Sequence, residues 1–207
     1  MRIYKKLDEI FRHGSKVKVL RFLFSEKDEH TGRTIADGIG MSASSIYKTL
    51  QEMKIEGLIT ARRKGKAILY KLQESNYIVK KLLEPLFLGE ESLYDDIISV
   101  VKKAFFQRKH DIVSVSIFGS VARKEETPSS DIDLVIIVEE PGKKAKIDVV
   151  IDKLNVFMAE KFQASISPYV LTRLEIRKKY AEKEPIITSI LEDNQLIYGE
   201  PIERIIA

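Results

Sequence analysis

The 207-residue sequence contains no cysteine, no tryptophan and only three histidines. Without cysteine the chain forms no disulfide bonds and no thiolate zinc sites. His13, His30 and His110 are scattered rather than at metal-ligand spacing, so we expect no histidine-based metal centre. No apolar run approaches the roughly 18 to 20 residues of a membrane span, and the first residues lack the apolar core of a secretory signal. We therefore expect a cytoplasmic protein with no membrane contact.

Charge is distributed unevenly along the chain. Residues 1–90 carry 18 lysines and arginines against 11 acids, a net charge of +7, whereas residues 91–207 carry 17 against 20, a net charge of −3. Since phosphate backbones attract lysine and arginine, we expect any nucleic-acid contact in the first part. The length suits one large domain or two small ones. We expect a first domain over residues 1–73, a linker helix over 74–90 and a second domain over 91–207.

The first domain begins with a helical pattern and ends with an alternating one. Apolar residues recur at helical spacing in residues 15–25, a short helix is expected over 34–38, and Ser42 is a candidate N-cap for a helix over 42–56. After Gly57 the period changes to two, which predicts a hairpin. Its tip is the basic run Arg-Arg-Lys-Gly-Lys. Three helices followed by a basic hairpin is the element order of a winged helix-turn-helix.

Residues 35–72, which read IADGIGMSASSIYKTLQEMKIEGLITARRKGKAILYKL, resemble the winged-helix domains of MarR-like and ArsR-like transcriptional regulators. The resemblance implies double-stranded DNA as a partner and a homodimer that reads paired half-sites. The alternative is a winged helix that binds protein, with a basic run that is only a solvated loop. The side chains expected to contact DNA are those that point outward from the helix or lie in the wing: Ser44, Ser45, Tyr47, Lys48, Gln51, Arg62, Arg63, Lys64 and Lys66.

The linker between the domains has the pattern of an amphipathic helix. It is expected from about Tyr77 to Leu88, interrupted by Pro85 and ended near Gly89. Ser92 is then the expected N-cap of the next helix. The linker helix packs either between the two domains or against a second copy of the chain.

The second domain is organised around residues 116–138, which read SIFGSVARKEETPSSDIDLVIIV. Strands place residues i and i+2 on one face, so Asp131 and Asp133 point the same way at the start of the second strand. Two adjacent carboxylates repel each other unless a cation, usually a divalent metal, shares the site. Gly119 permits a tight turn in which the amide of Ser120 faces a phosphate. The pattern therefore predicts a site for phosphate and metal.

The motif of Gly-Ser, ten residues and Asp-x-Asp resembles the signature of the DNA polymerase β-like nucleotidyltransferases, in particular the minimal nucleotidyltransferase branch. Gly119, Ser120, Arg123, Asp131 and Asp133 occupy the matching positions. The resemblance implies a mixed β-sheet flanked by helices, and with it an α+β, two-domain chain. It also implies Mg²⁺ and a nucleoside triphosphate as cofactors. Arg123 either neutralises a phosphate or braces the acidic turn.

The family's third metal-binding carboxylate has no counterpart on the next expected strand. That strand reads QASISPYVLT, with Ser165 or Ser167 where the resemblance implies an acid. Asp148 and Asp152 lie earlier, on a helix, and are expected on a solvated face. A serine binds a divalent cation less strongly than a carboxylate does, so the catalytic pair Asp131 and Asp133 looks incomplete.

Two functions of different classes follow. The first is a DNA-binding regulator whose nucleotidyltransferase-like domain binds nucleotide and Mg²⁺ or mediates assembly. The second is an active minimal nucleotidyltransferase that transfers a nucleoside monophosphate to a protein or small molecule, as in toxin–antitoxin pairs. An inherited fold with no ligand is a third possibility. The basic winged helix and the missing acid favour the first.

Overall fold

The computed structural model describes residues 4–207. The chain folds as two compact units, of which the first ends at Leu93 and the second begins at Tyr94. Each unit has its own hydrophobic core. No helix within residues 4–207 is long and apolar enough to cross a membrane.

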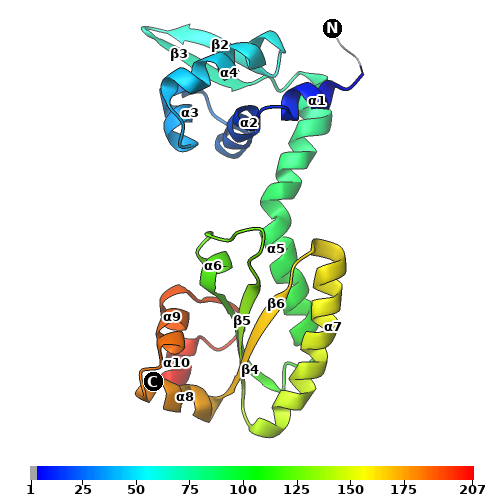
Figure 1. Ribbon diagram of the computed structural model, residues 1–207, viewed down its shortest axis with the longest axis vertical. Coiled ribbons are helices and arrows are strands. Elements are labelled where there is room, and N and C mark those ends of the chain that lie inside the picture. Colours follow the sequence, from blue (N-terminus) through cyan, green and yellow to red (C-terminus); the bar gives the residue numbers. More distant parts are fainter. Residues whose placement is uncertain (1–3) are drawn as a thin grey trace. The chain divides into compact units, whose positions relative to one another are not determined.

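The first unit is a winged helix-turn-helix (Figure 1). Its three-stranded sheet has the order β1-β3-β2, and both strand pairs are antiparallel. The hairpin of β2 and β3 is the wing. The elements of this unit before the long helix are α1 (Lys6–Phe11), α2 (Gly14–Glu26), β1 (His30–Thr31), α3 (Gly32–Gly38), α4 (Ala43–Ile55), β2 (Ile59–Lys64) and β3 (Ala67–Leu72).

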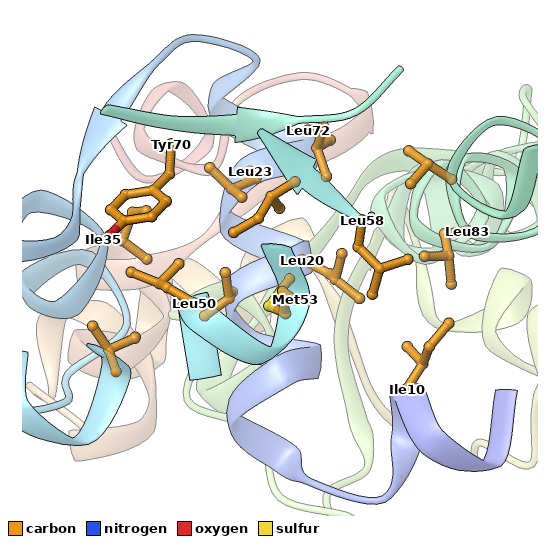
Figure 2. Close-up of a cluster of buried hydrophobic side chains, with 14 of the residues drawn as sticks. Ile10, Leu20, Leu23, Ile35, Leu50, Met53, Leu58, Tyr70, Leu72 and Leu83 are labelled. Carbon is orange, nitrogen blue, oxygen red and sulfur yellow. The ribbon is translucent and has the colours of Figure 1, made fainter. Parts of the chain in front are cut away.

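The core of this unit is built where the apolar faces of α2 and α4 meet below the wing. Figure 2 shows Leu20 and Leu23 of α2 beside Leu50 and Met53 of α4, and each is at most 1% exposed. The predicted cap of α4 is confirmed, since the Ser42 side chain accepts a hydrogen bond from the amide of Ser45. Capping at one end and burial of one face fix the direction of α4, and with it the side chains on its outer face.

The prediction of two separate helices around Gly89 is wrong. A π-helical turn, η1 (Val79–Leu83), runs directly into α5 (Glu84–Phe106), and Gly89 and Ser92 both lie inside α5. Pro85 has no amide hydrogen, and its ring excludes the usual close approach of the carbonyl four residues earlier. The wider turn absorbs this conflict, because the amide of Glu84 bonds the carbonyl of Val79, five residues back. The helix therefore passes Pro85 without ending.

The second unit is a three-layer arrangement of helices on both faces of a mixed sheet (Figure 1). The sheet order is β6-β5-β4-β7, in which β5 and β6 are parallel and the other pairs antiparallel. Helices α5 and α7 cover one face, and α8, α9 and α10 cover the other. The remaining elements are β4 (Ile112–Phe118), α6 (Gly119–Ala122), β5 (Ile132–Val138), η2 (Pro141–Lys143), α7 (Lys144–Phe162), β6 (Ile166–Thr172), α8 (Arg173–Ala181), α9 (Pro185–Asp193), β7 (Gln195–Gly199) and α10 (Ile202–Ile206).

The predicted fold class, α+β with a winged helix followed by a mixed β-sheet flanked by helices, is confirmed. The turn after β4 is the single helical turn α6, and a helix that the sequence analysis does not predict, α10, follows β7. The central strands β4 and β5 are almost entirely buried, as their apolar runs indicate. These two buried strands fix the positions of the motif residues 116–138 relative to one another.

Candidate functional site

The two motif aspartates lie where β5 begins. Asp131 directly precedes the strand, and Asp133 is its second residue, opposite Phe118 of β4. Gly119 follows Phe118 with a φ of +75°, and a Cβ built on it would lie only 2.4 Å from Oδ2 of Asp133. Only glycine fits, because any side chain would meet the carboxylate and would also strain the backbone. The motif glycine therefore lets α6 begin directly against the acid.

Two serines lie beside the aspartates, where the resemblance implies a third acid. The parallel register of β5 and β6 sets Ser167 opposite Asp133, and the two side chains share a hydrogen bond. The Ser165 hydroxyl donates to Oδ1 of Asp131. Among residues 4–207 no three side chains of His, Cys, Asp or Glu form a metal-binding group. The donor set fits one divalent cation held by two carboxylates, with hydroxyls beside them, and does not fit a pair of metal ions.

The pKa of the Asp133 carboxyl is raised above its ordinary value. Burial is the largest cause, and the neighbouring Asp131 carboxylate adds to it. The hydrogen bond from Ser167 and the charge of Arg123 act in the opposite direction but are outweighed. Burial and the Asp131 charge make the ionised form of Asp133 unfavourable. A bound cation would stabilise that ionised form.

Arg123 is engaged in ion pairs. Its Nε lies 2.9 Å from Glu125 Oε2, and one of its terminal nitrogens lies 2.7 Å from Asp193 Oδ2, at the end of α9. Both contacts raise its pKa. Close by, the Gln195 amide donates to the carbonyl of Ala122 at 2.7 Å. These contacts hold α6 in position. Contact of Arg123 with a phosphate remains a prediction.

Sequence reasoning missed Asp193 and Gln195, which lie far along the chain with no local motif. Asp193 ends α9 and Gln195 begins β7, and no local sequence pattern reveals that these two elements return to α6. Asp148 and Asp152 occupy exposed positions on α7, as expected. Neither joins the acidic pair in a metal-binding group.

The outer face of α4 carries most of the side chains predicted to contact DNA. Tyr47 is 59% exposed, and Lys48 is exposed beside it. The hydroxyls of Ser44 and Ser45 lie 3.1 and 2.7 Å from the capping oxygen of Ser42. Gln51 is half-buried and hydrogen-bonds the hydroxyl of Tyr70 in β3. The side chains most open to a ligand are therefore Tyr47 and Lys48.

The wing tip turns at Gly65, which has a φ of +63°. Arg62 does not point freely to solvent, because both its Nε and a terminal nitrogen bond the carboxylate of Glu29. This pairing lowers the pKa of Glu29. Arg63 donates to the carbonyl of Gly65 at 3.2 Å, and Lys64 and Lys66 are exposed. The tip therefore presents cations from the end of β2 and from the turn that follows it, and Arg62 is already paired.

Comparisons with known proteins agree with both units. Residues 98–196 match the family model described as "Nucleotidyltransferase domain". A putative protein adenylyltransferase of Methanocaldococcus jannaschii is 32% identical over 96 residues, which cover 46% of this chain and 85% of that protein. An uncharacterized HTH-type transcriptional regulator of Mycobacterium tuberculosis is 27% identical over 73 residues, or 34% of this chain. The chain spans 63% of that regulator's length.

Among solved structures, spectinomycin adenyltransferase from Enterococcus faecialis, with ATP and spectinomycin, is 18% identical and has a TM-score of 0.43. The match covers 54% of this chain and 59% of that one.

Proposed function

The chain belongs to the nucleotidyltransferase domain family, and from this we propose that it is a DNA-binding regulator whose nucleotidyltransferase domain binds a nucleoside triphosphate with Mg²⁺. One observation carries the proposal. The aspartate pair and its glycine turn are assembled, while the position of a third acid is held by Ser165 and Ser167. Such a site suits retention of a nucleotide rather than its transfer.

For the nucleotide, the proposed binding residues are Gly119, Ser120 and Arg123, and the proposed metal ligands are Asp131 and Asp133. Mg²⁺ prefers a few carboxylates together with phosphate oxygens and water. Asp131 and Asp133 would hold the family's Mg²⁺, whose charge would offset that of the carboxylates and the phosphates. Arg123 would remain near the phosphates while its pairs with Glu125 and Asp193 hold it in position.

For DNA, the support is a basic unit with exposed polar side chains on α4 and an exposed basic wing. A helix in the major groove contacts base edges, and a wing contacts the adjacent backbone. Tyr47, Lys48 and the hydroxyl of Ser44 are the proposed base-edge and phosphate contacts of α4. Arg63, Lys64 and Lys66 are the proposed backbone contacts of the wing. The whole-chain role as a regulator is part of this proposal.

The proposed homodimer has a candidate surface on α5 and the turn before it. Leu82, Leu86 and Leu93 are 41%, 50% and 47% exposed at spacings of four and seven residues. A Cβ on Gly89, between the last two, would meet nothing within 4 Å, so the fold of one chain does not need glycine there. Glycine inside a helix is unfavourable by roughly 1 kcal/mol relative to alanine. Close approach of a second α5 would explain both features.

The nucleotide proposal is tested by equilibrium binding of fluorescent ATP and GTP analogues to the full chain, with Mg²⁺ or with EDTA. We expect Mg²⁺-dependent binding that is lost in Asp131→Ala and Asp133→Ala. No saturable binding of either analogue, or binding unchanged in both variants, would contradict the proposal.

The DNA proposal is tested by selection of genomic fragments on the immobilised full chain. We expect a palindromic site whose affinity falls steeply with salt concentration. If no fragment is enriched, the regulator proposal fails. The oligomeric state, measured by light scattering for wild type and Gly89→Leu, tests the dimer separately.

A second function, transfer of a nucleoside monophosphate to a protein, is favoured by one observation. The relative from Methanocaldococcus jannaschii is described as a putative protein adenylyltransferase and matches over 85% of its length. Label transferred from NTP to the chain or to a co-purified protein, and lost in Asp131→Ala, would favour this function. If the serines account for a lack of transfer, Ser167→Asp restores a third carboxylate opposite Asp133 and should raise transfer above the wild-type level.

A further inference from the structure

A groove on the second unit lies between α5 and α7, on the sheet face that these two helices cover. Its volume is about 510 Å³. Lys103 and Arg108 line it from the end of α5 and the residues that follow, and Lys153, Phe157 and Lys161 line it from α7. We call it the α5–α7 groove. It contains none of the motif residues Gly119, Ser120, Arg123, Asp131 and Asp133.

The groove is cationic within an acidic part of the chain. Its lining includes four cations and no acid, although residues 91–207 carry a net charge of −3. Lys103, Lys153 and Lys161 have no carboxylate partner among the residues that the structure describes. Some lysines elsewhere in the unit are paired: Lys143 lies 2.7 Å from Asp111, and Lys144 lies 2.6 Å from Glu175. Arg108 lies 3.9 Å from Asp111, so the three groove lysines are the cations left for an external anion.

The same groove exposes apolar surface. Phe157 is 41% exposed and Val149 is 51% exposed, and both line the groove. The Lys161 ammonium lies 5.4 Å from the centre of the Phe157 ring, which keeps this cation beside the apolar surface. Exposed apolar side chains that adjoin unpaired cations mark a surface for an amphipathic ligand.

We propose that the α5–α7 groove binds an acidic amphipathic helix of a partner protein. The apolar side of such a helix covers Phe157 and Val149, and its carboxylates pair with Lys103, Lys153 and Lys161. Charge complementarity selects the partner, because a basic or neutral helix leaves the lysines unpaired in a desolvated interface. A nucleic-acid strand would pair with the cations but would leave the aliphatic surface around Val149 uncovered.

The test uses a designed peptide of about 18 residues, long enough for about 27 Å of helix, with leucines on one face and glutamates on the other. Its binding to the full chain is followed by fluorescence anisotropy. We expect micromolar affinity that falls at least tenfold in Lys103→Glu/Lys153→Glu. The matched control, Lys178→Glu/Lys183→Glu, makes the same charge change on exposed positions outside the groove and should lose less than threefold.

A second variant, Phe157→Ser, separates the peptide from nucleic acid. The exposed position of Phe157 makes a folding defect small, and circular dichroism checks it. Loss of peptide affinity in this variant supports the proposal. Three outcomes would overturn it: no peptide binding at low salt, equal losses in the groove and control variants, or tighter binding of single-stranded RNA that Phe157→Ser leaves unchanged.

Discussion

The acids of the two units act in opposite ways. In the winged-helix unit, Glu29 lies at the surface and its pKa is lowered because Arg62 donates hydrogen bonds to it. In the nucleotidyltransferase unit, Asp133 is half-buried and its pKa is raised by burial and by Asp131. The first carboxylate is neutralised by a cation of its own chain. The second lacks enough neutralising charge, which a bound cation would supply.

This difference distinguishes the charged surface of the winged-helix unit from the acidic pair of the second unit, which has a fixed geometry. The winged helix presents charges that solvent screens, so single substitutions there change binding in small, additive steps. The acidic pair lies between two strands and a glycine turn. A single added carbon atom, a Cβ on Gly119, would clash there with the Asp133 carboxylate. Four variants test this contrast, from the largest expected effect to the smallest.

Asp133→Asn should abolish Mg²⁺-dependent nucleotide binding, with a loss of about a hundredfold or more, equivalent to about 2.7 kcal/mol. The amide keeps the shape of the carboxyl but cannot supply its charge to a metal. Fluorescent-nucleotide titration measures the loss, and Asp148→Asn, on an exposed position of α7, is the control. If Asp133→Asn binds the nucleotide with wild-type affinity, Asp133 is not part of the binding site.

The same variant should raise the thermal stability of the chain without ligand at neutral pH. Because the folded-state pKa of Asp133 lies above its unfolded value, the folded state holds more protons between the two values. Stability is therefore lost as pH rises through this window, and the ionised group remains unfavourable above it. The Tm advantage of Asp133→Asn should shrink when the pH is lowered below the ordinary aspartate pKa. A variant less stable than wild type at pH 7 would contradict this account.

Gly119→Ala should destabilise the second unit by about 2 kcal/mol, because alanine is strained at positive φ and its Cβ meets the Asp133 carboxylate. Chemical denaturation measures the change, and nucleotide affinity should fall with it. Gly142→Ala is the control, since a Cβ there meets nothing within 4 Å. Equal stability of the two variants would mean that the turn is not needed.

How far the sequence predicts these features depends on how local their causes are. The cap at Ser42, the wing and the location of Asp131 and Asp133 where a strand begins follow from neighbouring residues, and the structure contains them. The contacts of Arg123 with Asp193 and of Arg62 with Glu29 join residues 70 and 33 positions apart, and no local pattern indicates them. The interruption predicted at Pro85 is absent because a π-helical turn accommodates the proline, which depends on backbone geometry rather than on residue type.

Arg63→Ala/Lys64→Ala should weaken DNA binding about tenfold, or about 1.4 kcal/mol, and should lower the salt dependence by about two phosphate contacts. The effect should be similar for all sequences, because wing cations are expected to contact the backbone. Anisotropy with a selected fragment at several salt concentrations measures it. Lys80→Ala, an exposed lysine of η1 away from the wing, is the control. An unchanged salt slope in the double variant would mean that the wing does not contact DNA.

Glu29→Gln should strengthen DNA binding about threefold, or about 0.6 kcal/mol. The substitution removes a negative charge beside the wing and releases the Arg62 guanidinium from its pair. The gain should be largest at low salt, where exposed charges are least screened. Removal of a carboxylate thus strengthens ligand binding in the first unit and abolishes it in the second. Weaker binding by Glu29→Gln would show that the pair holds Arg62 in the orientation that DNA requires, and Arg62→Ala would then weaken binding by a similar amount.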